Sequence, residues 1–160
     1  IVPQFALHID DARLAEKAAF IYCIYSPGFK AIYIGQTYNT FGALGRLTQH
    51  LSNTDNSTLR SRLNKLRSIE NASLQDIDFF CHRLPKKRRF VNSNSDYREA
   101  VEYRVQYAMM NLRNGAHPPI GIISTVRHNA YVDLPDITKL GNSIAVKIDE
   151  WLRVVTKTSP

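Results

Sequence analysis

The chain has 160 residues, 44% hydrophobic and 22% charged, so it is long and apolar enough to bury a core, and extensive disorder is excluded. No apolar run is long enough to span a membrane. Cys23 and Cys81 have neither metal-site spacing nor a disulfide framework, which favours reduced thiols and a cytoplasmic, intracellular setting. The net charge of +7 favours a polyanionic partner, with nucleic acid ahead of an anionic membrane.

Residue periodicity predicts a mixed α/β (α+β) fold, in which a small antiparallel three-stranded sheet is flanked by helices. Runs rich in aromatic and β-branched residues indicate strands, and leucines at helical spacing indicate amphipathic helices. A Pro-Gly turn joins the first two strands into an antiparallel hairpin. The predicted elements, in chain order, are a short helix 10–18, strands 19–26 and 31–37, helices 41–52 and 57–69, strand 76–84, a basic loop 85–96, and helices 97–114 and 141–155.

The same patterns predict which side chains are buried. In the first strand, even-numbered side chains such as Tyr22 are expected on one face and odd-numbered ones such as Cys23 on the other. In each helix, apolar residues three or four positions apart are expected to face the core. The expected stripes are Leu44, Leu47 and Leu51; Leu59, Leu63 and Leu66; Val101, Val105, Ala108 and Leu112; and Ile144, Ile148, Trp151 and Val155.

Two tyrosines mark the predicted hairpin. Tyr22 ends the triplet Phe-Ile-Tyr in the first strand, and Tyr33 begins the triplet Tyr-Ile-Gly in the second, with ten residues between them. A rival triplet, Cys-Ile-Tyr, ends at Tyr25, which lies on the opposite strand face from Tyr22 and gives a shorter spacing. The motif is therefore assigned to Tyr22 and Tyr33, while Tyr25 and Tyr38 are expected to be packing or surface residues.

Charged side chains follow on the predicted helices. Arg46 and His50 are four residues apart and therefore share one helix face. Glu102, in the triplet Val-Glu-Tyr, lies at the edge of the apolar stripe of helix 97–114, between solvent and core. A planar guanidinium binds phosphate oxygens, and one carboxylate with waters and a phosphate oxygen is a usual way to hold Mg²⁺. These residue types favour phosphodiester chemistry.

In this order, the motifs of residues 18–116 resemble those of the GIY-YIG nuclease superfamily. The resemblance implies a metal-dependent endonuclease of a restriction or defence type that hydrolyses DNA phosphodiester bonds with Mg²⁺ or Mn²⁺. We expect one nuclease domain over residues 1–160, in which the resemblance does not explain 117–160, a C-terminal extension with one helix predicted from its apolar pattern. Two positions depart from the family pattern, because Phe20 replaces the first glycine and the neutral Gln36 stands where several members have a lysine.

The resemblance also implies roles for individual residues. Tyr22 would be the general base, Tyr33 would help to hold the phosphate or the attacking water, and Glu102 would bind the metal. Arg46 would clamp the phosphate. An unperturbed phenol has a pKa of about 10, whereas that of histidine is about 6.5, so His50 is the alternative base and both assignments remain open.

Basic side chains outside the motif predict contacts with a nucleic-acid backbone, which are salt-sensitive and carry no sequence preference. Runs of charge are also typical of solvated loops, and the nuclease motif decides in favour of binding. An asparagine twelve residues after the glutamate matches the position of a family asparagine. The predicted nucleic-acid-binding residues are Arg60, Arg62, Lys65, Lys86, Lys87, Arg88, Arg89 and Asn114.

Two other classes of protein remain open at this stage. One is a non-catalytic nucleic-acid-binding module on the same fold. The other is a structural domain, which predicts that Tyr22, Arg46 and Glu102 lie far apart. One active site cuts one strand, so double-strand cleavage requires a homodimer or two binding events. Because the first residue is Ile1, we expect the chain to be part of a longer protein.

Overall fold

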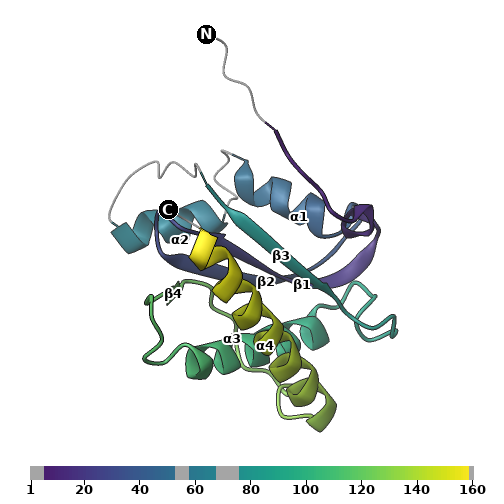
Figure 1. Ribbon diagram of the computed structural model, residues 1–160. Coiled ribbons are helices and arrows are strands. Elements are labelled where there is room, and N and C mark those ends of the chain that lie inside the picture. Colours follow the sequence, from purple (N-terminus) through teal and green to yellow (C-terminus); the bar gives the residue numbers. More distant parts are fainter. Residues whose placement is uncertain (1–5, 53–57, 68–75, 159–160) are drawn as a thin grey trace.

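The computed structural model describes residues 6–52, 58–67 and 76–158 (Figure 1). Within these residues a sheet lies between two layers of helices. The elements, in chain order, are the 3-10 turn η1 (Ala12–Ala15), β1 (Ala18–Ser26), β2 (Ala31–Asn39), α1 (Gly42–Leu51), α2 (Thr58–Arg67), β3 (Asp78–Arg83), α3 (Asp96–Leu112), β4 (Gly121–Ile122) and α4 (Pro135–Thr158).

The sheet has the strand order β3-β1-β2-β4. The long central strand β1 is antiparallel to both β2 and β3, as the sequence predicts. The prediction of a three-stranded antiparallel sheet was wrong in one respect, because β4 adds a fourth strand, parallel to β2, and makes the sheet mixed. This strand has only two residues, Gly121 and Ile122, which is too short to produce an alternating pattern in the sequence.

Each face of the sheet has its own core. Even-numbered residues of β1, such as Tyr22 and Ile24, pack with leucines of α1 and α2. Odd-numbered residues, such as Ile21 and Cys23, pack with buried side chains of α3 and α4. Figure 1 shows the same arrangement, with α1 and α2 above the strands and α3 and α4 below them. The predicted alternation of faces along β1 is confirmed.

Several predicted helix details were wrong. In α1, Leu51 is 37% exposed and the polar His50 is buried at 1% exposure, because a hydrogen-bonding partner for the imidazole lies in the sheet below. In α3, Leu112 is 40% exposed and Met109 takes the buried position. The predicted helix 10–18 is a single 3-10 turn, and α4 is longer than predicted at both ends.

Part of the predicted second helix lies outside the described residues, namely positions 57, 68 and 69 and the side chain of Leu66. Leu59 and Leu63 of α2 are buried, as predicted. The predicted helix of the C-terminal extension is α4, and its Ile144 and Ile148 are fully buried. None of the helices in the described part of the chain combines the length and the hydropathy that a membrane span requires.

Candidate active site

The position of Tyr22 depends on a glycine in the neighbouring strand. Tyr22 of β1 and Gly35 of β2 are direct partners in the sheet register. A Cβ atom at position 35 would lie 2.3 Å from the Tyr22 hydroxyl oxygen, so the phenol ring lies flat across Gly35 and extends over β2. The glycine of the Tyr-Ile-Gly triplet is therefore needed for space, because any larger residue would displace the phenol.

Two side chains of α1 meet at the Tyr22 hydroxyl. Its oxygen lies 2.7 Å from His50 Nε2, and Arg46 Nε donates to it over 3.3 Å. Arg46 and His50 are one helical turn apart, so the predicted shared face brings both to the same atom. Because a guanidinium can only donate, the phenol oxygen accepts from Arg46, and the phenol O–H can donate to His50 when Nε2 is the unprotonated nitrogen of the ring.

Tyr33 stands beside this group on the same face of the sheet. Its ring is stacked on that of Tyr22, with centroids 6.3 Å apart and an interplanar angle of 16°. The His50 ring meets it edge-on at 4.9 Å. The Tyr33 hydroxyl lies 3.2 Å from Oγ1 of Thr58, the first residue of α2. Strands and both covering helices therefore fix the two phenols.

Helix α3 runs alongside β2 and brings Glu102 to the same region. Arg98 Nε donates to Gln36 Oε1 over 2.8 Å, and two turns later Gln106 Nε2 donates to the Ile34 carbonyl over 3.4 Å. Glu102 lies one helical turn from each of these two residues of α3, whose partners Ile34 and Gln36 flank Gly35. That residue is the glycine covered by Tyr22, and the Glu102 carboxylate is close enough to raise the pKa of the Tyr22 phenol.

Glu102 is a buried carboxyl group with cations on two sides. It is only 8% exposed, and burial raises its pKa to about 8, with a further upward contribution from Glu99. Arg46 and Arg62 act in the opposite direction, as does a 3.0 Å hydrogen bond that Gln106 Nε2 donates to Glu102 Oε1. The carboxylate therefore lies within the influence of guanidinium groups from α1 and α2.

Burial favours the neutral forms of Tyr22 and His50. It raises the pKa of the Tyr22 phenol, and Tyr33 adds to this, although Arg46 partly opposes it. It lowers the pKa of His50 to about 3, and the positive charge of Arg46 lowers it further. At neutral pH both members of the pair are therefore uncharged.

The donor set around Glu102 fits a hard divalent cation. Among the described residues, no three His, Cys, Asp or Glu side chains gather closely enough to form a metal site of their own. Zinc sites are usually built from three or four such ligands, whereas Mg²⁺ is commonly held by one or two carboxylates, waters and substrate phosphates. A single carboxylate under the influence of two guanidinium groups is compatible with the second pattern.

The structure thus brings together the five residues predicted to be catalytic. Arg62, predicted as a nucleic-acid-binding residue, also acts on Glu102. Sequence reasoning also missed Thr58 and Gln106, although spacing offered a signal. Thr58 precedes Arg62 by four residues and Gln106 follows Glu102 by four, so each pair shares a helix face.

The other predicted nucleic-acid-binding residues lie away from this cluster. Arg60 donates to the Leu51 carbonyl over 2.9 Å, and Lys65 is exposed on α2. Asn114 is exposed beyond the end of α3, and at about 1.5 Å per helical residue it lies about three turns from Glu102. The structure does not bring Asn114 to the site.

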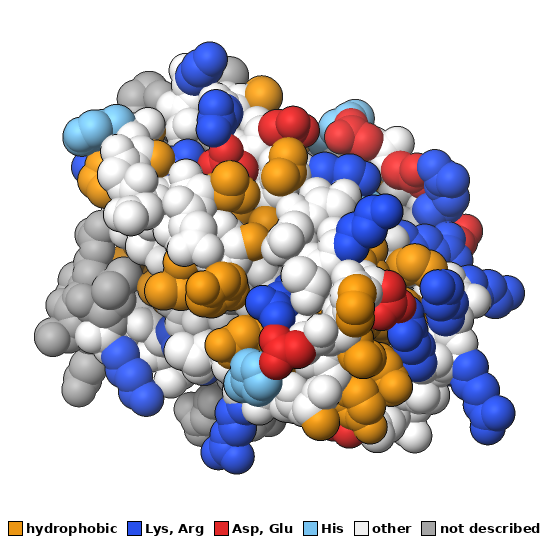
Figure 2. Space-filling model, turned by 90° about the horizontal axis from the view of Figure 1, so that it is seen from below, with side chains coloured by type: hydrophobic (Ala, Val, Ile, Leu, Met, Phe, Trp, Pro, Cys, Tyr) orange, Lys and Arg blue, Asp and Glu red, His pale blue; other side chains and the backbone are white. Residues whose placement is uncertain are grey.

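The predicted basic run lies in the turn between β3 and α3. Lys86, Lys87 and Arg88 are exposed there. Arg89 is not free to bind a phosphate in the same way, because it pairs with Asp136 and its guanidinium lies over the ring of Phe90, 4.9 Å from the centroid. Figure 2 shows Lys and Arg side chains gathered toward the right, the side on which this turn lies in Figure 1.

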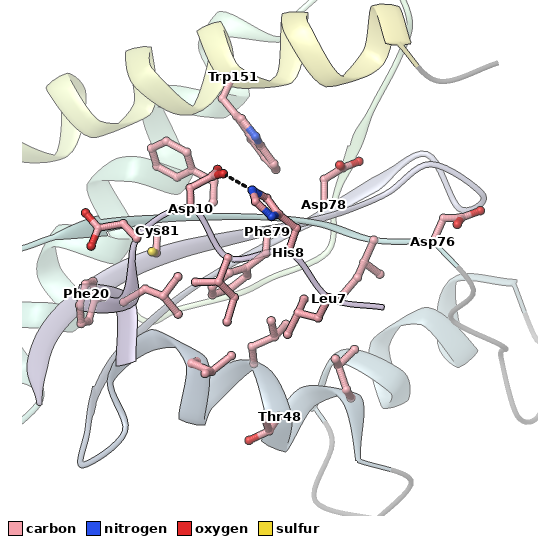
Figure 3. Close-up of a pocket in the computed structure, with 18 of the residues that line it drawn as sticks. Leu7, His8, Asp10, Phe20, Thr48, Asp76, Asp78, Phe79, Cys81 and Trp151 are labelled. Atoms are coloured by element: carbon pink, nitrogen blue, oxygen red, sulfur yellow. Dashed lines mark hydrogen bonds and ion pairs between the residues drawn. The ribbon is translucent and has the colours of Figure 1, made fainter. Parts of the chain in front are cut away.

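A separate groove of about 1520 Å³ lies between residues 6–14, β3 and α1 (Figure 3). None of the five clustered residues lines it. Asp76, Asp78 and Asp10 project at its walls, and Asp10 is paired with His8 at 2.8 Å. Carboxylates repel phosphate groups, so this groove is a poorer candidate for phosphate binding than the Tyr22 cluster.

Comparisons of the chain with protein-family models, curated proteins and solved structures give no match. A function is therefore inferred from the side chains and geometry of the site.

Proposed function

We propose that the chain is a phosphodiester hydrolase acting on nucleic acid, and specifically a metal-dependent DNA endonuclease of the GIY-YIG type. The observation that supports this most strongly is the Tyr22 hydroxyl, held between Arg46 and His50 beside the buried Glu102. Phosphodiester hydrolysis needs a proton acceptor for water and positive charge on the phosphate. The cluster contains residues of both kinds.

Arg46 is the proposed phosphate clamp. Two of its five N–H groups contact Tyr22 and Gln49, at 3.3 and 2.9 Å. Other edges of the planar group are then available to the non-bridging oxygens of a phosphodiester. Because its Nε also donates to the phenol oxygen, Arg46 would hold the phosphate next to the group that receives the proton from water.

Tyr22 and His50 are proposed to act as one proton-transfer pair. The attacking water gives a proton to the Tyr22 oxygen while the phenol proton passes to His50 Nε2. The resulting hydroxide forms the bond to phosphorus as the P–O3′ bond breaks, and the departing 3′ oxygen takes a proton from water to become a hydroxyl. Burial favours both neutral side chains, so a phenolate–imidazolium pair would not accumulate beforehand. The two transfers would therefore coincide with attack, and both candidate bases take part.

Glu102 is proposed to hold Mg²⁺ or Mn²⁺, with waters and phosphate oxygens as the other ligands. When bound, the ion supplies positive charge to the phosphoryl group and to the departing oxygen. Gln106 fixes one carboxylate oxygen through its 3.0 Å hydrogen bond and thereby orients Glu102. Arg60, Lys65 and the exposed basic run at 86–88 are proposed to contact more distant phosphates of the duplex.

A nicking assay on supercoiled plasmid DNA tests this proposal. We expect the wild-type chain to nick plasmid in Mg²⁺ or Mn²⁺ but not in EDTA, and Glu102→Gln to lose at least a hundredfold in rate while retaining DNA binding. Glu150→Gln, which changes an exposed carboxylate on α4, is the matched control and should cleave normally. DNA binding without cleavage in either metal would instead support the non-catalytic binding module.

A further inference from the structure

Helix α2 directs two side chains toward the proposed site. Thr58 and Arg62 are four residues apart and share one helix face. Thr58 Oγ1 contacts the Tyr33 hydroxyl at 3.2 Å. Arg62 extends to the outer edge of β2, where its Nη1 donates to the Ile123 carbonyl over 3.0 Å and its Nη2 donates to Thr125 Oγ1 over 2.8 Å. The guanidinium therefore bridges α2 and the segment that follows β4.

The segment that receives Arg62 is itself fixed to β2. The Ile123 amide donates to the Ile32 carbonyl over 3.0 Å, and the buried Ser124 Oγ accepts from the Ile34 amide over 2.9 Å. Two hydrogen bonds from Arg62 to such an anchored segment hold its planar group in one orientation. A side chain ordered before the ligand binds loses less conformational entropy when it does.

Arg62 forms no ion pair with any side chain in the part of the chain that the structure describes. Both of its partners, the Ile123 carbonyl and the Thr125 hydroxyl, are uncharged. It nevertheless influences Glu102, as Arg46 does from α1. Gln36, beside the glycine of the site, is neutral and turned toward Arg98. Glu102 neutralised by a proton, which its burial favours, or by a divalent cation would leave Arg62 available to an anion.

We propose that Arg62 is a second phosphate-binding residue of this site, which holds a phosphate of the bound strand on the α2 side of Glu102 while Arg46 holds the scissile one. This inference rests on the proposed function. In this arrangement, Arg46 of α1 and Arg62 of α2 contact successive phosphates of one strand. Lys65, one turn further along α2, then continues the same basic track in solvent.

Salt-dependent DNA binding in EDTA tests the inference without requiring cleavage. A fluorescent 30-base-pair duplex is titrated with the full chain at several salt concentrations. Each phosphate contact contributes about 0.9 to the slope of log K against log salt. We expect Arg62→Ala to lower the slope by about that amount and to weaken binding roughly 10- to 100-fold. Lys139→Ala, which removes an exposed charge from α4, should leave the slope unchanged.

Arg62→Lys and thermal unfolding separate phosphate binding from bracing of the 121–125 segment. Lysine keeps the positive charge but loses the pair of hydrogen bonds to Ile123 and Thr125. We therefore expect Arg62→Lys to restore most of the salt slope, even if the Tm of this variant falls as far as that of Arg62→Ala. An unchanged slope in a folded Arg62→Ala or a failure of Arg62→Lys to restore it overturns the inference. If the wild-type chain does not cleave DNA but the slopes behave as expected, only the hydrolase proposal fails.

Discussion

At the level of single residues, the proposed chemistry depends on position 35 being a glycine, which has no side chain. Gly35 leaves the space across which the Tyr22 phenol reaches Arg46 and His50. The sequence contains this information as a Tyr-Ile-Gly triplet, yet the reason for the glycine is visible only once Tyr22 is seen opposite it in the strand register.

Gly35→Ala should therefore displace the phenol. The added Cβ would lie 2.3 Å from the Tyr22 hydroxyl oxygen and 2.4 Å from its ring carbon Cζ, so the ring has to move. We expect a stability loss of about 1–3 kcal/mol by urea denaturation, and a loss of cleavage of about a hundredfold or more. Gly28→Ala is the control, since nothing lies within 4 Å of its added Cβ. Normal cleavage by Gly35→Ala would show that the position of the phenol is unimportant.

The buried Glu102 should make the metal-free protein less stable as the pH rises. Its pKa is about 8 in the folded chain, against 4.5 for an ordinary glutamate, so between these values the unfolded chain releases a proton that the folded chain keeps. Stability falls across that window and levels off above it. Each tenfold change in the ionisation constant corresponds to about 1.4 kcal/mol, so the fall amounts to a few kcal/mol.

Glu102→Gln removes this dependence. In EDTA its Tm should be close to that of the wild-type chain near pH 4.5 and above it at pH 8 to 9. Mg²⁺ should narrow the difference, because a bound cation compensates the buried charge. A wild-type Tm that rises relative to Glu102→Gln between pH 5 and 8 would contradict the assigned environment of this carboxyl group.

At the level of elements, α3 is attached to the sheet by side chains at four-residue intervals. Arg98 is 5% exposed, and its Nη1 donates to the carbonyls of Phe90, Asn92 and Asn94 over 2.8 to 3.1 Å. Its Nε also contacts Gln36 of β2. One buried guanidinium thus secures the turn before α3 and the start of the helix that carries the metal-binding candidate.

Arg98→Met should destabilise the chain by about 3 kcal/mol, because buried carbonyls lose their donor. The matched variant Arg153→Met removes an arginine from α4 whose side chain is 66% exposed, and it should cost less than about 1 kcal/mol. Urea denaturation of both proteins measures the difference. Equal losses in the two variants would rule out an anchoring role for Arg98.

The same elements show what sequence patterns reveal about the fold and where they stop. Alternation along β1 and leucine spacing in α2 were sufficient to predict which side chains are buried, because burial there follows from hydrophobicity alone. Leucine spacing wrongly predicted that Leu51 is buried in the last turn of α1. His50 is buried there instead, because its imidazole forms a hydrogen bond with Tyr22, 28 residues earlier. The sequence pattern also gave no sign of the partners of Arg62, which lie more than 60 residues away. Contacts this remote leave no local period in the sequence.

At the level of the whole molecule, the predicted site draws on both layers of helices and on the sheet between them. Tyr22, Arg46, His50 and Glu102 come from β1, α1 and α3 of one chain. The order of the motif residues along the sequence suggested this convergence, whereas the place of Asn114 beyond the end of α3 was not evident from its spacing.

One site per chain should cut one strand at a time. In a plasmid time course at low protein concentration, we expect nicked circles to accumulate before linear DNA appears. The rate should fall steeply with salt, because the net charge of +7 promotes non-specific binding to the duplex. Linear DNA formed from the outset without nicked circles would instead indicate that two chains act together.

The most direct test of the proposed proton-transfer pair is the single-turnover cleavage rate of Tyr22→Phe in Mg²⁺, measured with saturating protein on a duplex that the wild-type chain cleaves. We predict a rate at least a hundredfold below wild type with DNA affinity within about twofold. Tyr25→Phe, which removes a hydroxyl on the opposite strand face, should cleave at the wild-type rate. Cleavage by Tyr22→Phe at the wild-type rate would contradict a catalytic role for the phenol.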